Sequence, residues 1–241
     1  MRLAFRFRVI PFVATVALVA LGIVLGNWQT GRAQEKLQIA AKLAQRAGAA
    51  PLVLAGGVDE PADIEYRRVR VSGEWVANWP LFLDNRPLHG KAGFILAMPF
   101  KIAGSDQHVL VLRGWLPRDA REYGKLPTFS TPGGTVSIEG VATFSAGHVM
   151  QLGSAGPVKP GTPLQNLTTG ELARASGLAL RPYFVQQTGA GQGESLVRDW
   201  PAPTTGIDKH RGYAFQWYAL AAMAALFFVI TGFRSGRKQV V

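Results

Sequence analysis

The fold is decided near the end of the chain, where a short polar and aromatic stretch leads into a long apolar one. The stretch reads Lys209-His210-Arg211-Gly212-Tyr213-Ala214-Phe215-Gln216-Trp217. Residues 213–233 contain no charge, and about twenty apolar residues are enough for a helix to cross a bilayer. The sequence therefore predicts a transmembrane helix over 213–233. The histidine at its mouth is a candidate functional residue, because ionisable groups at a membrane are costly unless they are paired or used.

A second apolar segment lies near the start of the chain, over residues 9–28, and Trp28 ends it as an interfacial anchor. The alternative is a cleaved signal peptide, since residues 1–8 carry three arginines. The apolar run is long for a signal, however, and the residues before Trp28 form a poor small-x-small cleavage site, so we expect an uncleaved transmembrane helix. Residues 28–47 are rich in helix formers and predict a helix that leaves the membrane and turns onto the domain that follows.

Basic residues flank the two predicted spans. Three arginines lie in residues 1–8 and three basic residues lie in residues 234–241, without any acidic residue. The positive-inside rule then places both termini in the cytoplasm. Residues 29–212 are expected to form one large β-rich domain on the other side. A bacterial inner membrane with this domain in the periplasm fits the pattern best.

The charge and the cysteine count exclude several classes of function. Of the net charge of +11, six units belong to the two predicted cytoplasmic tails. The remainder is mild for residues 29–212 and does not indicate a nucleic-acid partner. The chain contains no cysteine, which excludes a disulfide scaffold, a thiol nucleophile and a thiolate metal site. A domain of this size can fold without such crosslinks.

Between the spans the apolar pattern changes to a period of two. Residues 68–75 alternate polar and apolar side chains, as in a half-buried strand. Turn signals separate the other predicted strands, which are 81–85, 93–102, 108–116, 135–144, 183–187 and, as a last edge strand, 195–200. Thr168 and Glu171 have the spacing of a capping box before a short helix that Gly177 ends. The sequence predicts an α+β membrane protein, in which a two-helix transmembrane hairpin carries an extracytoplasmic antiparallel β domain, a curled sheet or small barrel.

No motif in the sequence is typical of an enzyme. We find no glycine-rich phosphate loop, no His-Glu-x-x-His and no Gly-x-Ser-x-Gly. His89, His108 and His148 fall in separate predicted loops or strand ends, and we interpret them as surface or edge histidines. Asp84 and Arg86 are expected to pair and to fix a turn. We therefore predict that the chain is not an enzyme.

His210 differs from the other histidines because of the residues that follow it. If the helix begins at or before His210, Tyr213 and Trp217 follow on the same face over about 10 Å. A flat aromatic ligand could lie against both rings while His210 binds its metal, since imidazole is the most common protein ligand for metals. On the residues alone an alternative stays open, namely an interfacial histidine within a belt of aromatic residues.

Several motifs occur in an order that is found in a known family. They are Gly26-x-Trp28-Gln29-x-x-Arg32-x-x-x-Lys36, Arg68–Trp75, Leu83-Asp84-Asn85-Arg86, Val111-Leu112-Arg113-Gly114-Trp115, Arg181-Pro182-Tyr183 and Lys209-His210-x-x-Tyr213-Ala214-x-Gln216-Trp217. On these motifs the chain resembles, from end to end, the surfeit-locus protein family of cytochrome c oxidase assembly factors, as a bacterial member. The resemblance implies a membrane protein that helps to build the haem a sites of a haem-copper terminal oxidase.

The resemblance also implies a haem a site at the outer edge of the hairpin. The histidine that matches His210 supplies an axial ligand to the iron, and the tryptophan that matches Trp217 lies near the porphyrin. We expect Tyr213 to flank the same ring. Ligation by a single histidine at an open edge would be reversible, as delivery of the haem to oxidase subunit I requires.

The first predicted span would supply the other wall of this site. We expect Trp28 and Gln29 to face the haem and Arg32 to lie near a propionate. The partners would be oxidase subunit I, docked on the β domain, membrane lipid, and in addition the haem a synthase. A second interpretation is a scaffold without haem, which stabilises immature subunit I or the haem a synthase and uses the same aromatic residues for helix packing. An enzyme acting on haem or a quinol is a third and weaker interpretation.

Overall fold

Two long helices and a β domain make up the part of the chain that the computed structural model describes. The described residues are 5–57, 61–119, 121, 124–151, 153, 156–189, 195–201 and 206–237. The chain divides into a helical unit, Met1–Lys42 with Pro201–Val241, and a β unit, Leu43–Trp200. Residues 1–4 and 238–241, which belong to the predicted cytoplasmic tails, lie outside the described residues.

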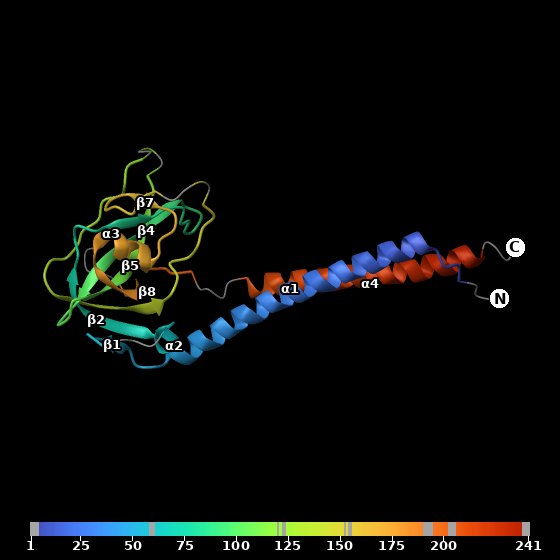
Figure 1. The fold of residues 1–241 in the computed structure, drawn as a ribbon, viewed down its shortest axis with the longest axis horizontal. Helices are drawn as coiled ribbons and strands as arrows, with labels where there is room; N and C mark the ends of the chain where they lie inside the picture. The colour runs from blue at the N-terminus through green and yellow to red at the C-terminus, as the bar shows by residue number, and fades with distance from the viewer. Residues whose placement is uncertain are drawn as a thin grey trace. The chain divides into compact units, whose positions relative to one another are not determined.

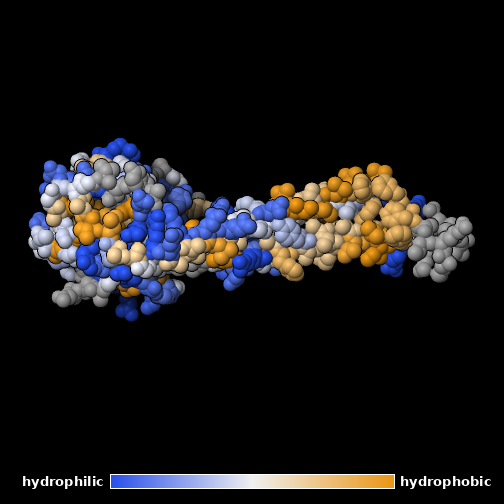
Figure 2. All heavy atoms as spheres, turned by 90° about the horizontal axis from the view of Figure 1, so that it is seen from below, coloured by the Kyte–Doolittle hydropathy of each residue, from blue (hydrophilic) through white to orange (hydrophobic). Residues whose placement is uncertain are grey.

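The helical unit contains α1 (Val9–Ala47) and α4 (Ile207–Arg237). Both helices are long and apolar enough to cross a membrane. Helix α1 joins the first predicted span and the predicted polar helix after it without a break. The two helices run side by side in opposite directions (Figure 1). Hydrophobic residues gather over one part of this pair and hydrophilic residues over the remainder (Figure 2).

The two helices approach each other closely at glycine residues. A Cβ atom added at Gly22 would lie 2.9 Å from the Cβ of Ala221 and 2.9 Å from the carbonyl oxygen of Trp217. A Cβ atom at Gly26 would overlap the ring of Tyr218, at 2.5 Å from its nearest carbon. Small residues at such contacts let helix backbones pack together inside a bilayer, where apolar side chains alone give no preference for protein over lipid.

The side of α4 that is covered by protein follows a repeat of four and three residues. The positions that are buried or half-buried include His210, Ala214, Trp217, Ala221, Ala224 and Phe228. This spacing is that of two helices packed along a nearly straight seam. At the end of this seam the ring of Phe5 packs edge-on against Phe228 and Phe233, with ring centroids 5.8 and 5.2 Å apart.

In the β unit, five strands form a closed ring. In ring order they are β2 (Arg68–Trp75), β6 (Val136–Thr143), β8 (Ala179–Gln187), β5 (Gln107–Pro117) and β4 (Gly93–Ile102). Strand β4 pairs back with β2, which closes the ring. The β5–β8 pairing is parallel and the other pairings within the ring are antiparallel. The prediction of a β domain that forms a curled sheet or small barrel is confirmed, although the parallel β5–β8 pairing departs from the antiparallel arrangement that was expected.

Short elements extend this ring. Strand β1 (Leu52–Leu54) pairs with β2, strand β3 (Leu81–Leu83) pairs with β4, and β7 (Pro163–Leu164) pairs with β3. The helices of this unit are α2 (Pro61–Ile64) and α3 (Thr169–Ser176). The predicted capping box of α3 and its left-handed glycine cap are both present. The predicted edge strand 195–200 forms only an isolated bridge between Val197 and Trp115.

Strand β5 is buried on both of its faces. Val109 and Val111 belong to one hydrophobic core, whereas Leu110 and Leu112 belong to another, which also contains Leu172 of α3. Successive side chains of a strand point to opposite faces. The apolar run at 109–112 is therefore continuous because both faces are covered, whereas β2 alternates because one face is exposed.

The predicted pairing of Asp84 with Arg86 is wrong. Arg118 donates to Asp84 instead. The buried guanidinium of Arg86 points inward and donates to the carbonyl oxygens of Gly147 and Gln165, at 3.0 and 2.9 Å. Asp84 and Arg86 stand two residues apart at a bend of the chain, and their side chains have different partners. Proximity in sequence therefore did not bring the two charged groups together.

The close approach of α1 and α4 can be tested by crosslinking. In a Gly22→Cys/Ala221→Cys variant, a disulfide needs only a small outward shift of the helices, because bonded cysteines have Cβ atoms about 3.8 Å apart. We expect mild oxidation to remove both thiols from reaction with a maleimide after denaturation. The chain has no cysteine of its own to interfere.

The matched control for this crosslink is the pair Val24→Cys and Ala222→Cys. Both positions are exposed on the same two helices. The control pair should keep its reactive thiols under the same oxidation. Equal thiol loss in the two pairs, or none in the Gly22/Ala221 pair, would contradict the helix contact.

Candidate functional site

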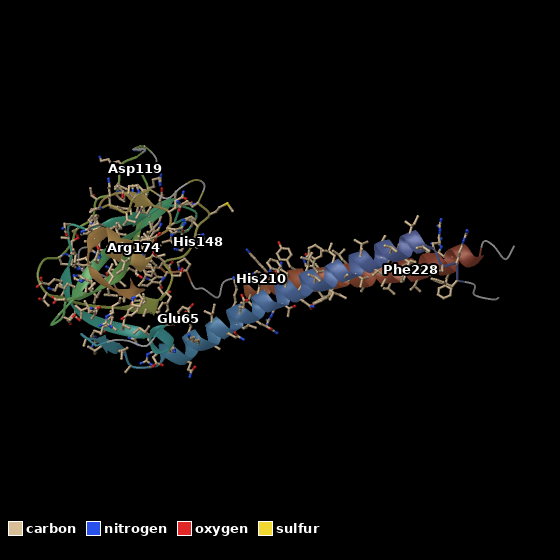
Figure 3. The ribbon with its side chains drawn as sticks, in the orientation of Figure 1. Glu65, Asp119, His148, Arg174, His210 and Phe228 are labelled. Atoms are coloured by element: carbon tan, nitrogen blue, oxygen red, sulfur yellow. The ribbon has the colours of Figure 1, made fainter. Side chains whose placement is uncertain are left out.

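The side chains of His210 and Gln29 meet between the two helices. His210 lies in the first turn of α4 (Figure 3). Its Nδ1 is 2.7 Å from Oε1 of Gln29 on α1. An amide oxygen can only accept a hydrogen bond, so Nδ1 of His210 is the donor in this contact, and the neutral imidazole then has its lone pair on Nε2. Among the described residues, no other hydrogen bond engages this ring. Nε2 of His210 is therefore available to a metal.

The packing of the helices explains why these two residues face each other. Gly22 packs against the backbone of Trp217. Gln29 follows Gly22 by seven residues, and His210 precedes Trp217 by seven residues. Seven residues make about two helical turns, or about 10 Å, and return to nearly the same face. In an antiparallel pair, the same step along both helices brings Gln29 opposite His210.

Tyr218 forms a second polar contact between the helices, and the sequence analysis missed it. Its hydroxyl donates to Oδ1 of Asn27 at 2.7 Å and lies 3.4 Å from Oγ1 of Thr30. Its ring lies against Gly26. The contact holds the register that the His210–Gln29 pair requires. In sequence, Tyr218 is one more aromatic residue in an apolar run, so only knowledge of its partner glycine could have singled it out.

The other predicted site residues on α4, Trp217 and Tyr213, differ in how far their side chains are exposed. Trp217 is half-buried and follows on the same protein-covered side of the helix. Tyr213, one turn after His210, is 53% exposed to the surroundings of the helix pair. The structure thus gathers His210, Gln29 and Trp217 along the seam, with Tyr213 beside it.

The remaining predicted residues on α1 lie on its exposed surface. Trp28 is 54% exposed, although it neighbours Gln29 in sequence. Arg32 donates to Glu35 at 2.8 Å, and both side chains are exposed. Consecutive positions on a helix are about 100° apart, so Trp28 and Gln29 cannot both point into the seam.

The single imidazole of His210 suits a metal whose other ligands come from a cofactor. Within the described residues, no group of three or more histidine, aspartate or glutamate side chains lies close enough to hold a bare ion. One imidazole with an amide partner can supply only an axial bond. A metal held by a porphyrin needs no more than that from a protein.

The motif residues of the β domain bind one another. Arg113 is the extra residue of a β-bulge in β5, because Leu96 pairs with Gly114 while the next residue pairs with Leu112. A bulge redirects a side chain, and the guanidinium of Arg113 is fully buried 4.5 Å from the ring of Trp75. Trp115 donates its ring N–H to the carbonyl oxygen of Arg86 at 2.6 Å. These motifs stabilise the barrel.

The histidines of the β domain do not form a site. His148 is exposed, and His89 lies 2.7 Å from Asp199 at the surface. His108, which the sequence predicts to be a surface or edge histidine, is buried at the start of β5. Burial lowers the pKa of His108, against smaller opposing effects of backbone hydrogen bonds to Ala179 and Asp106.

These features define an α+β protein with two membrane-length helices and a barrel-like β domain between them. Residues 16–222 match the model of the SURF1 family, and the chain belongs to this family. The resemblance inferred from the motifs is thereby confirmed.

Individual relatives are distant in sequence. A SURF1-like protein of Monosiga brevicollis is 23% identical, over 93% of this chain and 88% of the relative. A SURF1-like protein of Rickettsia bellii is 23% identical, over 86% of this chain and 85% of the relative. The cytochrome oxidase assembly protein SHY1 of Saccharomyces cerevisiae is 29% identical, over 43% of this chain and 27% of the relative.

The buried state of His108 predicts a pH dependence of stability. Because burial lowers the pKa of His108, this side chain takes up a proton below about pH 6.5 in the unfolded chain but not yet in the folded chain. The contribution of His108 to the free energy of unfolding is therefore fully present above that pH and is lost as the pH falls. We expect the wild type to lose more stability than His108→Gln between about pH 7.5 and 5.5. Urea unfolding of the full chain in detergent measures this difference, and equal pH dependence in both proteins would contradict it.

Proposed function

We propose that this chain assists the assembly of a haem-copper terminal oxidase by holding haem a and passing it to oxidase subunit I. Membership of the SURF1 family and the name of the yeast relative, a cytochrome oxidase assembly protein, support the assembly role. The geometry at His210 supports the haem role. The chain acts as a carrier and is not an enzyme.

The hydrogen bond between His210 and Gln29 is the observation that carries the haem proposal. Nδ1 is the donor in this contact, so the lone pair of the neutral imidazole lies on Nε2. A metal-ligating histidine almost always donates its other N–H to a nearby acceptor, which sets the ring orientation. Haem a, when bound, would supply an iron centre that imidazole can ligate, and His210 would hold it. Gln29 acts as the positioning residue and His210 as the ligand.

The remaining predicted residues have secondary roles in this proposal. Trp217 offers a half-buried indole face two turns along the helix from His210. Tyr213 flanks the same side, and both rings can cover an apolar macrocycle. Arg32 and Trp28 on the exposed surface of α1 are available to a propionate and to the membrane interface.

We place the chain in a bacterial inner membrane, with both termini in the cytoplasm and the β domain in the periplasm. The two helices of membrane length support this placement. Basic residues without acidic ones occupy residues 1–8, before α1, and residues 234–241, at the end of α4, as the positive-inside rule requires for cytoplasmic ends. His210 then lies at the periplasmic edge of the membrane.

A scaffold role without haem is the second candidate function. It is favoured by the exposed rings of Trp28 and Tyr213, which could pack against transmembrane helices of immature subunit I or of the haem a synthase. In this case the His210–Gln29 bond would serve only to hold α1 and α4 together.

The haem proposal predicts an optical signature. The full chain, co-expressed with the enzymes that make haem a and then purified, should carry haem a with an absorption spectrum of a histidine-ligated iron. His210→Ala should lose most of this haem. Gln29→Leu should keep the ligand but bind haem about 10- to 100-fold more weakly, as is typical when the partner of a metal ligand is removed.

The matched control for this experiment is His148→Ala, the same substitution at an exposed histidine of the β domain. It should retain the wild-type spectrum. A wild type without haem a would refute the haem proposal. Unchanged haem in His210→Ala would refute only the assignment of the ligand.

The assembly role predicts a phenotype in the organism that carries this chain. Deletion of its gene should lower the content of haem a and the activity of the haem-copper oxidase in the membranes. The wild-type chain should restore both, and His210→Ala should restore neither. Full rescue by His210→Ala would favour the scaffold role, whereas an oxidase unaffected by the deletion would overturn both roles.

A further inference from the structure

An apolar recess lies beside the contact of α1 and α4, farther along the hairpin than His210. It has a volume of about 440 Å³. Its lining comes from both helices and includes Leu21, Gly22, Trp217, Met223, Ala224 and Phe227. Every residue that lines the recess is apolar.

The recess exists because small and large residues are placed together on the two helices. Gly22 is buried and Ala224 is half-buried, so they form a shallow floor. Leu21 and Phe227 are largely exposed and form raised sides. No side chain of the described residues fills the space between them, which leaves a slot open to the bilayer.

Trp217 connects this recess to the His210 site. It lies on the same side of α4 as His210, and it also lines the recess. From Trp217 to Phe227 the recess follows ten residues of helix, or about 15 Å. A chain of three isoprenoid units has nearly the same extended length, roughly 14 Å, because about eleven bonds of about 1.5 Å each advance in a zigzag.

We infer that the recess holds the hydroxyethylfarnesyl side chain of haem a, an inference that rests on the haem role proposed above. A porphyrin bound at His210 would have Trp217 between its edge and the start of the recess. Lipid chains are as apolar as the lining, so a preference for the farnesyl chain over lipid comes from close packing rather than from the hydrophobic effect. The flexible thioether of Met223 suits an irregular, branched chain.

Haem b and haem o provide the test, because they differ only in this side chain. The full chain in nanodiscs of phosphatidylethanolamine and phosphatidylglycerol is titrated with each haem, and the Soret absorbance and tryptophan fluorescence are followed. The wild type should bind haem o about tenfold more tightly than haem b, the equivalent of roughly ten good carbon–carbon contacts. Ala224→Phe fills the floor of the recess and should abolish this preference without weakening haem b.

Ala225→Phe is the matched control, because it adds the same ring at the neighbouring exposed position. It should bind both haems like the wild type. If Ala224→Phe also weakens the binding of haem b, the substitution has disturbed the hairpin. The smaller change Ala224→Val then takes its place, and we expect it to weaken the binding of haem o alone. A wild type that binds both haems equally well through His210 would overturn this inference alone. A wild type that binds neither would overturn the proposed haem role as well.

Discussion

The contact of Gly22 with Ala221 and the backbone of Trp217 sets the register of the two long helices. The positions of the other interhelical contacts of the hairpin follow from this register. Two turns in one direction bring Gln29 to His210, and in the other direction the rings of Phe5 and Phe228 close the pair. A shift of one helix by a single turn, about 5.4 Å, would separate His210 from its partner. A side chain larger than hydrogen at position 22 therefore acts on a site about 10 Å away.

The physics of a bilayer explains why the contact combines glycine with polar groups. Apolar side chains alone do not drive helices together in lipid, because lipid tails are equally apolar. Close backbone packing supplies dispersion contacts, and each interhelical hydrogen bond contributes on average about 0.6 kcal/mol. The bonds of Tyr218 to Asn27 and of His210 to Gln29 thus add specificity to a weak general attraction. They select one register among several that the small residues alone would allow.

The sequence predicted those parts that depend on local pattern. The alternation in 68–75 identified β2, and the Thr168–Glu171 spacing identified the cap of α3, because both signals lie within one element. The ring closure between β2 and β4 and the bulge at Arg113 depend on pairing between distant segments. For the same reason the motifs named His210 and Gln29 but not their hydrogen bond, and no local signal identified Tyr218 or the recess beside Ala224.

The chemistry of the partner amide bears on how a carrier could release its cargo. A carboxylate partner would draw the Nδ1 proton of His210 toward itself and make Nε2 a stronger donor to a metal. Gln29 is neutral, so it orients the ring while adding less to its basicity. In the proposed role this favours a weak axial bond, and the recess then adds affinity through the side chain of the haem rather than through its iron. In the proposed role, a separation of orientation, ligation and anchoring would let subunit I compete for the iron without first having to break a strong metal–ligand bond.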